Sequence, residues 1–362
     1  MLKVFETFAG VGSQRMALQN LGIPHEVVGI SEIDKYALQS YQAIHDECPN
    51  YGDVSKLNPQ ILPDFDLFTY SFPCQDLSVA GQGKGLIKGQ TRSGLLYECE
   101  RIIEVKRPKY LLLENVKNLV GKKFKPQFDE WLRYLESLGY TNYWKVLNAK
   151  DFDVPQNRER VFVVSVLGEH KPYQFPQPLP SIRRIKDVLE PVVEDKYYFK
   201  DRPFKLVNKG HQAEFLNMAF EQGSRIYSED HIMRTLGAKD RGQNNILVRA
   251  YVEGLNNQNA RVFDSEGICS ALDTMQGGHR QPKILEPTTQ LSLFPIDDLE
   301  LTEQDYRVRK LTALECWRLM GFSDEDFKKA KESGVSNTQL YKQAGNSIVV
   351  PVLEGIFKSL FL

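Results

Sequence analysis

Over the first 165 residues, short runs of β-branched and aromatic residues alternate with amphipathic stretches of helical period. This alternation is typical of βαβ units, in which helices cover a mostly parallel sheet. The predicted strands cover residues 3–8, 26–30, 67–70, 110–113, 143–147 and 160–166. The predicted helices cover residues 13–20, 35–44, 95–106 and 128–138. We therefore expect an α/β, Rossmann-like first domain over residues 1–172.

The pattern changes after residue 170, where a Pro-rich link (KPYQFPQPLP) leads into a polar region rich in Gly and Asn. Such a shift marks a domain boundary. We expect a smaller, mainly β and irregular domain over residues 173–305. Helical period returns in LTALECWRLMGF and SIVVPVLEGIFKSLFL, so residues 306–362 are predicted to form helices that pack back on the first domain.

The polar region contains a weak internal repeat at an offset of 36 residues. The segment QGSRIY, with Gln222 and Arg225, aligns with QNARVF, with Gln258 and Arg261. Two copies are too few for a solenoid. They predict two similar strand–loop units that each present a Gln and an Arg.

Composition narrows the class of protein. Hydrophobic residues make up 41% and charged residues 26% of the 362 residues, which is ordinary for a soluble globular chain. No apolar run reaches the length of a membrane span, so a cytoplasmic protein is expected. The five cysteines are scattered without a CxxC pair or a zinc-type His spacing, which predicts free thiols and no metal site.

The net charge of −1 argues against a protein that coats nucleic acid through bulk electrostatics. Residues 82–125, however, hold eleven Lys/Arg and four Glu, a local charge of +7. Such a patch could steer a polyanion to one face. It is equally compatible with basic side chains spread over a solvated helix surface.

A glycine-rich turn separates the first predicted strand from its helix. Phe8-Ala-Gly10-Val-Gly12-Ser13 lets backbone N–H groups approach a ligand at a helix N-terminus. Glu32, after the second strand, is placed to bind a ribose, and Asp53 adds a third polar group unless it caps a helix. Arg15 stands where a dinucleotide fingerprint needs a third glycine, so a purely structural turn remains open.

Cys74 follows Pro73 directly after a predicted strand that ends near Tyr70. Its thiol therefore lies at the carboxyl edge of the sheet, where ligands bind in such folds. A reactive thiol and a buried inert one both suit that position. The Gly-rich run at residues 81–85 follows, and its flexibility suits a loop that closes over a site.

Two charged motifs follow predicted strands. Glu114 ends the apolar run Leu111-Leu-Leu113, where burial would raise its pKa and make it a proton donor near neutral pH. Arg158 and Arg160 alternate in QNRER and share one face if the segment is extended. Anion or substrate binding and surface ion pairing are both open for these arginines.

These motifs, in this order, resemble those of the cytosine-C5 DNA methyltransferases. FAGVGS resembles the cofactor loop, SFPCQ the nucleophile loop, ENV the glutamate motif and QNRER the paired-arginine motif. RKLTALECWRLMGF and YKQAGNSIVVPV look like the last two motifs. The similarity covers residues 8–166 and 307–352, and a variable target-recognition region lies between them.

The resemblance implies a mechanism on a cytosine flipped out of double-stranded DNA. Cys74 would add to C6, Glu114 would bind N3 and the exocyclic amine, and Arg158 would help from the opposite side. The catalytic set it implies is Cys74, Glu114, Arg158 and Arg160. The methyl group would come from S-adenosylmethionine, held by Phe8, Gly10, Gly12, Glu32, Asp53, Pro73, Leu95, Asn346 and Ser347.

For DNA, the resemblance implies contacts from Gln75, Ser78, Arg92, Gln222, Arg225, Thr235 and Arg261. We hypothesise that Arg225 and Arg261 read guanine, because Arg pairs bidentately with its major-groove edge. Ala271 replaces the threonine expected in the second copy, which leaves open which copy does what. The expected protein is a bacterial or phage monomer, with a possible cognate restriction endonuclease acting independently.

Three alternatives are weighed against this interpretation. A transfer-RNA cytosine-C5 methyltransferase would share the catalytic motifs, although the recognition region of about 135 residues is larger than such an enzyme requires. A catalytically inactive homologue that binds DNA is opposed by the intact PCQ, ENV and QNRER motifs. A nicotinamide dehydrogenase is opposed by Arg15 and by the strand-end Cys and Glu.

Overall fold

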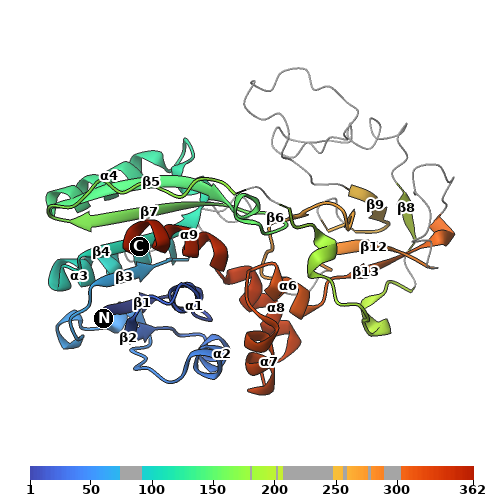
Figure 1. Ribbon diagram of the computed structural model, residues 1–362, viewed down its shortest axis with the longest axis horizontal. Helices are drawn as coiled ribbons and strands as arrows, with labels where there is room; N and C mark the ends of the chain where they lie inside the picture. Colours follow the sequence, from blue (N-terminus) through green and yellow to red (C-terminus); the bar gives the residue numbers. More distant parts are fainter. Residues whose placement is uncertain are drawn as a thin grey trace.

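The computed structural model describes residues 1–73, 92–179, 182–200, 203–206, 248–255, 259–275, 279–288 and 303–362. These residues form two lobes, one around a large sheet and the other around a small sheet (Figure 1). Three short helices lie where the lobes meet, namely α6 (Ala313–Arg318), α7 (Asp324–Glu332) and α8 (Asn337–Asn346).

The large sheet has the strand order β2-β1-β3-β4-β7-β5. Pairing is parallel from β2 through β4, and β7 runs antiparallel to both of its neighbours. The prediction of a mostly parallel α/β sheet is therefore confirmed. The strands are Leu2–Thr7 (β1), His25–Ser31 (β2), Leu67–Tyr70 (β3), Tyr110–Val116 (β4), Tyr140–Asn148 (β5) and Glu159–Leu167 (β7).

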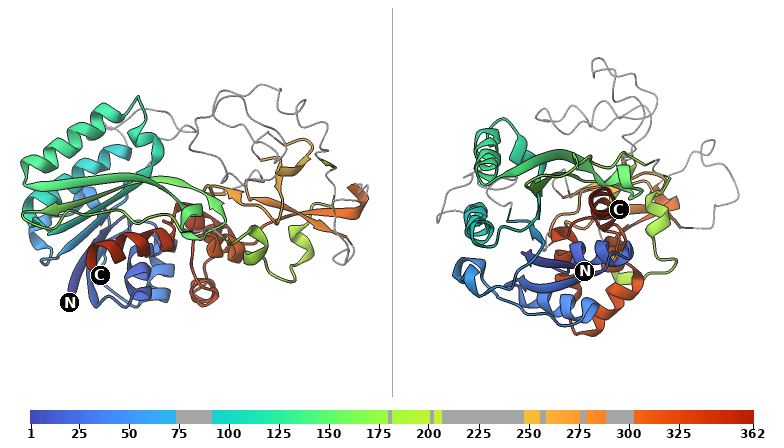
Figure 2. Two further views of the ribbon diagram at one scale, coloured as in Figure 1. Left: turned by 45° about the horizontal axis from the view of Figure 1, so that its top comes forward. Right: turned by 60° about the vertical axis from the view of Figure 1, so that its left-hand side comes forward.

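Helices cover both faces of this sheet (Figure 2). One face carries α1 (Ser13–Asn20), α2 (Lys35–His45) and the C-terminal α9 (Val350–Phe361). The other face carries α3 (Leu96–Lys106) and α4 (Lys125–Ser137). Each face has its own apolar core, because the strands are buried on both sides. The predicted helices all form, and α1 has the predicted bounds.

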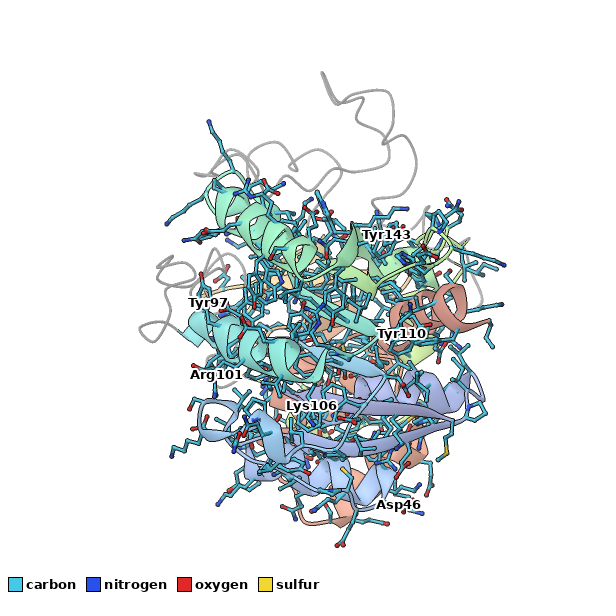
Figure 3. All side chains as sticks on the ribbon, turned by 90° about the vertical axis from the view of Figure 1, so that its left-hand side faces the viewer. Asp46, Tyr97, Arg101, Lys106, Tyr110 and Tyr143 are labelled. Atoms are coloured by element: carbon cyan, nitrogen blue, oxygen red, sulfur yellow. The ribbon has the colours of Figure 1, made fainter. Side chains whose placement is uncertain are left out.

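Helix α3 is tied to the loop that follows α2. Arg101, labelled in Figure 3, donates from Nη2 to the carbonyl oxygens of Val54 and Leu57 at 3.4 and 3.3 Å. These residues lie in and after the short 3-10 helix Val54–Lys56 (η1), which begins directly after Asp53. The contact therefore fixes the loop that carries Asp53 to the edge of the sheet.

The C-terminal helices return to the first lobe, as the sequence predicts. Helix α9 packs with α1, and Leu353 and Ile356 are fully buried in the shared core. Among the described helical segments, Asn337–Phe361 has the length and apolar composition to cross a membrane, and 56% of its apolar window is buried inside the protein. A helix in the core of a folded protein meets the same criteria.

The small sheet has the strand order β13-β12-β10-β9-β8. Its last strand, β13, begins at Tyr306, where the sequence predicts the start of the C-terminal helices. We therefore propose that the domain boundary follows Lys310. The strands are Phe204–Leu206 (β8), Val248–Val252 (β9), Arg261–Phe263 (β10), Lys283–Pro287 (β12) and Tyr306–Lys310 (β13). A separate pair joins β11 (Cys269–Ser270) to β6 (Gln156–Asn157) in parallel.

Candidate active site

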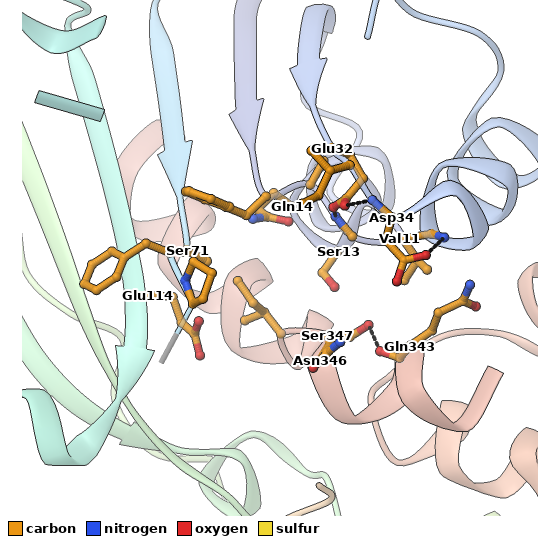
Figure 4. Close-up of a pocket in the computed structure, with 18 of the residues that line it drawn as sticks. Val11, Ser13, Gln14, Glu32, Asp34, Ser71, Glu114, Gln343, Asn346 and Ser347 are labelled. Atoms are coloured by element: carbon orange, nitrogen blue, oxygen red, sulfur yellow. Dashed lines mark hydrogen bonds between the residues drawn. The ribbon is translucent and has the colours of Figure 1, made fainter. Parts of the chain in front are cut away.

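A cavity of about 390 Å³ opens at the carboxyl ends of β1 to β4, against the end of α8. Figure 4 shows Glu114 toward one end and Asp34 toward the other, with Asn346 and Ser347 along one side. Eleven of the predicted site residues line this single cavity. They are Phe8, Gly10, Glu32, Asp53, Pro73, Leu95, Glu114, Arg158, Arg160, Asn346 and Ser347.

The turn after β1 is built on left-handed backbone conformations. Phe8, Gly10 and Gly12 have φ values of 55°, 58° and 80°. At Gly12 a side chain would also collide with the layer below, because an added Cβ would lie 2.5 Å from Nε2 of His45. Gly12 is not among the residues that line the cavity. Gly12 therefore allows the loop to pack closely on α2, whereas Gly10 lines the cavity.

A polar layer supports this turn from beneath. Tyr41 donates a hydrogen bond to Glu6, and the guanidinium of Arg15 lies 5.8 Å from the Tyr41 ring centroid. Burial raises the pKa of Glu6 to about 7, although Tyr41 and Arg15 favour its charged form. Position 15, where a dinucleotide fingerprint has its third glycine, is thus occupied by an arginine whose side chain contributes to this polar layer.

Glu32 ties the cofactor-type loop to the next strand. Its Oε2 accepts the Gly10 N–H at 2.8 Å, and its Oε1 accepts the Asp34 N–H at 2.7 Å. Burial raises the pKa of Glu32, while both N–H donors favour the carboxylate. A carboxylate has about four acceptor positions, so Glu32 keeps acceptor capacity for a hydroxyl group of a ligand.

Asp53 has the capping role that the sequence left open. Its Oδ1 accepts the N–H and the hydroxyl of Ser55, at 3.0 and 2.8 Å, at the start of η1. These bonds hold the pKa of Asp53 below its usual value. Because Asp53 also lines the cavity, the cap orients a carboxylate that a ligand amine can reach.

Glu114 and Arg160 form the charged end of the cavity. Glu114 follows the apolar run of β4 with 9% of its surface exposed, and Arg160 Nε lies 3.3 Å from its Oε1. Burial raises the pKa of Glu114, and the charges of Arg160 and then Arg158 oppose that shift. The neighbouring Asn115 donates to the carbonyl of Phe72 at 3.0 Å. That bond fixes the segment leading to Pro73 beside the glutamate.

Arg158 is held by backbone oxygens. Its Nη1 donates to Leu272 at 2.8 Å, and its Nη2 donates to Gly345 and Ser347 at 2.9 Å each. The side chain is 4% exposed. The sequence-based expectation placed Arg158 opposite Glu114 as the group that assists it. In the structure Arg160 has the ion pair with Glu114, whereas Arg158 joins separate segments of the site and its charge also acts on Glu114. The assisting role of Arg158 stays a prediction.

The end of α8 closes the cavity. Ser347 donates its hydroxyl to the carbonyl of Gln343 at 2.7 Å, and Asn346 follows Gly345 in the lining. Gly345 admits no side chain, since an added Cβ would lie 1.8 Å from the carbonyl oxygen of Asp273. The segment around Asp273 therefore packs directly on the loop that presents Asn346 and Ser347.

Several predicted residues are not placed. Cys74, Gln75, Ser78, Gln222, Arg225 and Thr235 lie outside the described residues, as does the side chain of Arg92. Arg261 begins β10 and pairs with Tyr251 of β9. Of the other cysteines, Cys99, Cys269 and Cys316 are buried and Cys48 is partly exposed. Burial raises the pKa of Cys99 and Cys269 to about 12, which suits core positions. Within the described ranges, no cluster of His, Cys, Asp and Glu could hold a metal ion.

The family model for C-5 cytosine-specific DNA methylases matches residues 2–362. The chain belongs to this family. The match favours a DNA cytosine-C5 methyltransferase over the transfer-RNA enzyme, and it removes the dehydrogenase alternative.

Curated relatives of this methylase come from bacteria and phages. The Type II methyltransferase M2.ScrFI of Lactococcus lactis subsp. cremoris is 39% identical, with 100% of this chain and 99% of the relative covered. The Orphan methyltransferase M.Phi3TI of Bacillus phage phi3T is 33% identical, with 99% and 97% covered. The Type II methyltransferase M.NlaX of Neisseria lactamica is 30% identical, with 98% and 95% covered.

Solved structures share the fold of this methylase. The S. pombe Dnmt2 methyltransferase matches with a TM-score of 0.64 at 20% identity, over 100% of both chains. The Entamoeba histolytica methyltransferase EhMeth matches with a TM-score of 0.67 at 16% identity, over 100% of this chain and 98% of the other. At such identities the likeness concerns the fold alone.

Some lining residues of the methylase were not anticipated from the sequence. Ile33 lies at the cavity with 77% of its surface exposed, and Lys342 forms an ion pair of 2.6 Å with Asp34. The sequence signal that could have identified Ile33 is its position, as an apolar residue directly after Glu32. No local pattern could reveal the pairing of residues that are 308 positions apart.

Proposed function

We propose that this methylase transfers the methyl group of S-adenosylmethionine to C5 of a cytosine flipped out of double-stranded DNA, through a covalent bond between Cys74 and C6. The supporting observation is the Glu114–Arg160 pair at the end of the same cavity that the glycine turn lines. Asn115, next to Glu114, also holds the segment that leads to Cys74. These contacts support a site in which a proton donor, the segment that leads to the nucleophile and a cofactor-type loop share one edge of the sheet.

The cavity fits S-adenosylmethionine in size and in chemistry. Its volume of about 390 Å³ is within the range of small-molecule sites. Phe8 and Ile33 offer apolar surface to an adenine, Glu32 has acceptors left for a ribose, and Asp53 is an acceptor for the adenine amine. Asn346, Ser347, Pro73 and Leu95 complete the lining. When bound, S-adenosylmethionine supplies an electrophilic methyl group on a sulfonium.

The chain's residues prepare the cytosine for that methyl group. The Cys74 thiolate forms a bond to C6, and the C5=C6 double bond breaks as its electrons move toward C5 and N3. Glu114 hydrogen-bonds N3 and the exocyclic amine, and Arg160 adds positive charge beside it. C5 then takes the methyl group, water removes the C5 proton, and the freed electron pair restores the double bond as Cys74 leaves.

Substitutions of Arg160 and of Arg158 should have different effects on the methylation rate and on Tm. Arg160→Gln is expected to lower the methylation rate constant about 10²-fold with little change in Tm, because it removes charge beside Glu114. Arg158→Gln is expected to lower Tm and weaken cofactor binding, because three backbone carbonyls lose their donor. Single-turnover rates and thermal denaturation of both variants test this. Equal loss of Tm in both variants would contradict the assignment.

Target recognition is proposed to lie in the small lobe and in the segment from Gln75 to Arg92. Gln222, Arg225 and Thr235 of the first repeat copy and Arg261 of the second are the proposed contacts, together with Gln75, Ser78 and Arg92 near the nucleophile. We also propose a monomer that acts in the cytoplasm of a bacterial or phage-infected cell. A cognate endonuclease remains part of the proposal, since relatives include both Type II and orphan methyltransferases.

Covalent trapping tests the mechanism. Duplex DNA that contains 5-fluorocytosine should form a stable complex with the wild type in the presence of S-adenosylmethionine, because fluorine at C5 blocks the final loss of a proton. Cys74→Ala should form none. Methylation assays on duplex DNA and on transfer RNA supply the comparison of substrates, and bisulfite sequencing gives the target site. Trapping that persists in Cys74→Ala, or a wild type that methylates no DNA, would refute the proposal.

A further inference from the structure

The peptide groups of Leu272 are held on both sides by the QNRER motif. The Leu272 N–H donates to Oε1 of Gln156 at 3.1 Å, and the Leu272 carbonyl accepts from Arg158 at 2.8 Å. Gln156 is fully buried and Leu272 is 3% exposed. Gln156 and Arg158 thus both hydrogen-bond the backbone of Leu272, a buried residue of the recognition region.

Gln156 has a second bond that reaches another segment. Its Nε2 donates to the carbonyl of Leu319 at 2.9 Å, just after α6. Its backbone pairs with Cys269 in the β6–β11 ladder. Gln156 therefore joins the paired-arginine motif, the end of α6 and residues 269–272. Arg158 extends the connection to the carbonyls of Gly345 and Ser347, beside the cofactor-type loop.

The segment held in this way is the second copy of the internal repeat. This copy covers residues 258–278, and its described part includes Arg261 in β10 and Asp273, whose carbonyl lies against Gly345. Among the described residues, this copy therefore packs against Arg158 and Gly345, two residues that line the cavity. Gln156 and Arg158 therefore connect any DNA contact made by this copy to the edge of the sheet that carries Glu114.

We propose that Gln156 is a positioning residue that seats the second repeat copy on the active site, so that DNA bound there presents its cytosine to Glu114. The proposal rests on the proposed function. With Gln156 replaced, the copy is held only by the remaining contacts, and productive binding of DNA is weakened. The chemistry itself is unchanged, since Gln156 does not line the cavity.

Two substitutions test this role. Gln156→Leu removes both side-chain bonds at similar volume, and it is expected to raise KM for duplex DNA about tenfold while kcat changes little. Gln156→Glu keeps an acceptor for Leu272, and when protonated it can also donate to Leu319. Burial raises the pKa of such a carboxyl. The ratio of its KM to the wild-type KM should therefore increase as the pH rises and this carboxyl loses its proton.

Asn142→Leu is the matched control. Asn142 also joins elements through its side chain, by donating to Leu132 and accepting from Ser165, but it lies at the end of β5 away from QNRER. This variant should lower Tm without raising KM for DNA.

The results can tell two failures apart. A wild type that methylates no duplex DNA defeats the proposed function. With an active wild type, a KM ratio for Gln156→Glu that stays flat with pH overturns the positioning role, as does an unchanged KM in Gln156→Leu. The Glu variant at low pH keeps the test valid if the Leu variant does not fold.

Discussion

Replacing Glu114 by Gln is expected to slow methyl transfer by a factor of about 10²–10³ while the protein stays folded. The amide has nearly the shape of the carboxyl and keeps one donor and one acceptor, so DNA binding should be largely retained. It carries no acidic proton and cannot stabilise charge that develops at N3 when Cys74 adds to C6. The loss should therefore appear in the rate of the chemical step, measured by single turnover with saturating DNA.

The pH dependence gives a second readout for Glu114. Burial raises the pKa of its carboxyl, so the protonated form persists to a higher pH than in an exposed glutamate. As pH rises through that pKa, the wild type loses its proton donor, and this contribution to the single-turnover rate falls. Glu114→Gln has no such proton to lose, so the ratio of wild-type to variant rate should decrease with rising pH.

Glu159→Gln is the control for this experiment. Glu159 directly precedes Arg160 in β7, but its side chain is 42% exposed and pairs with Lys117 at 2.8 Å. It should retain nearly wild-type rates at every pH. A rate for Glu114→Gln within threefold of the wild type, or an equal loss in Glu159→Gln, would contradict the role given to Glu114.

Local sequence signals were sufficient for the central part of the fold. The apolar run Leu111–Leu113 forms a strand because only a fully buried strand accommodates it, and Glu114 then has to lie at the sheet edge. The bounds of α1 follow in the same way from its apolar period and from the glycine turn ahead of it. Because parallel strands end at one edge, the shared location of the polar strand-end residues was also predictable.

The roles of the two arginines were not predictable. Alternation in an extended segment places Arg158 and Arg160 on one face. The segment is interrupted, however, with β6 ending at Asn157 and β7 beginning at Glu159. Between them, the Arg158 N–H bonds to the side chain of Asn148. The partners of the Arg158 guanidinium come from residues 114 to 189 positions away, and no local period contains that information.

A second large effect is expected where the two lobes join. Arg309 of β13 donates from Nη1 and Nη2 to the two carboxylate oxygens of Glu315 in α6, at 2.8 Å each, and both side chains are fully buried. Glu315 also accepts the backbone N–H groups of Thr312 and Glu190, at 2.7 and 2.9 Å. Arg309 in turn pairs with Glu286 of β12 at 2.6 Å. Four donors therefore converge on one buried carboxylate.

Glu315→Gln is expected to lower the free energy of unfolding by about 3–5 kcal/mol, because it leaves a buried guanidinium without its main counter-charge. It also turns an amide NH₂ toward groups that can only donate. Urea denaturation followed by tryptophan fluorescence measures the loss. Replacing both partners, as in Arg309→Met with Glu315→Leu, removes the unpaired charge together with the pair.

The double variant should therefore be more stable than Glu315→Gln, although Glu286 and the N–H groups of Thr312 and Glu190 lose a partner. That order separates the cost of an unpaired buried charge from the net contribution of the ion pair. If Glu315→Gln unfolds at the wild-type urea concentration, the carboxylate does not hold β13 against α6. The stability of the junction would then come from apolar packing around Trp317, which is 1% exposed in the same helix.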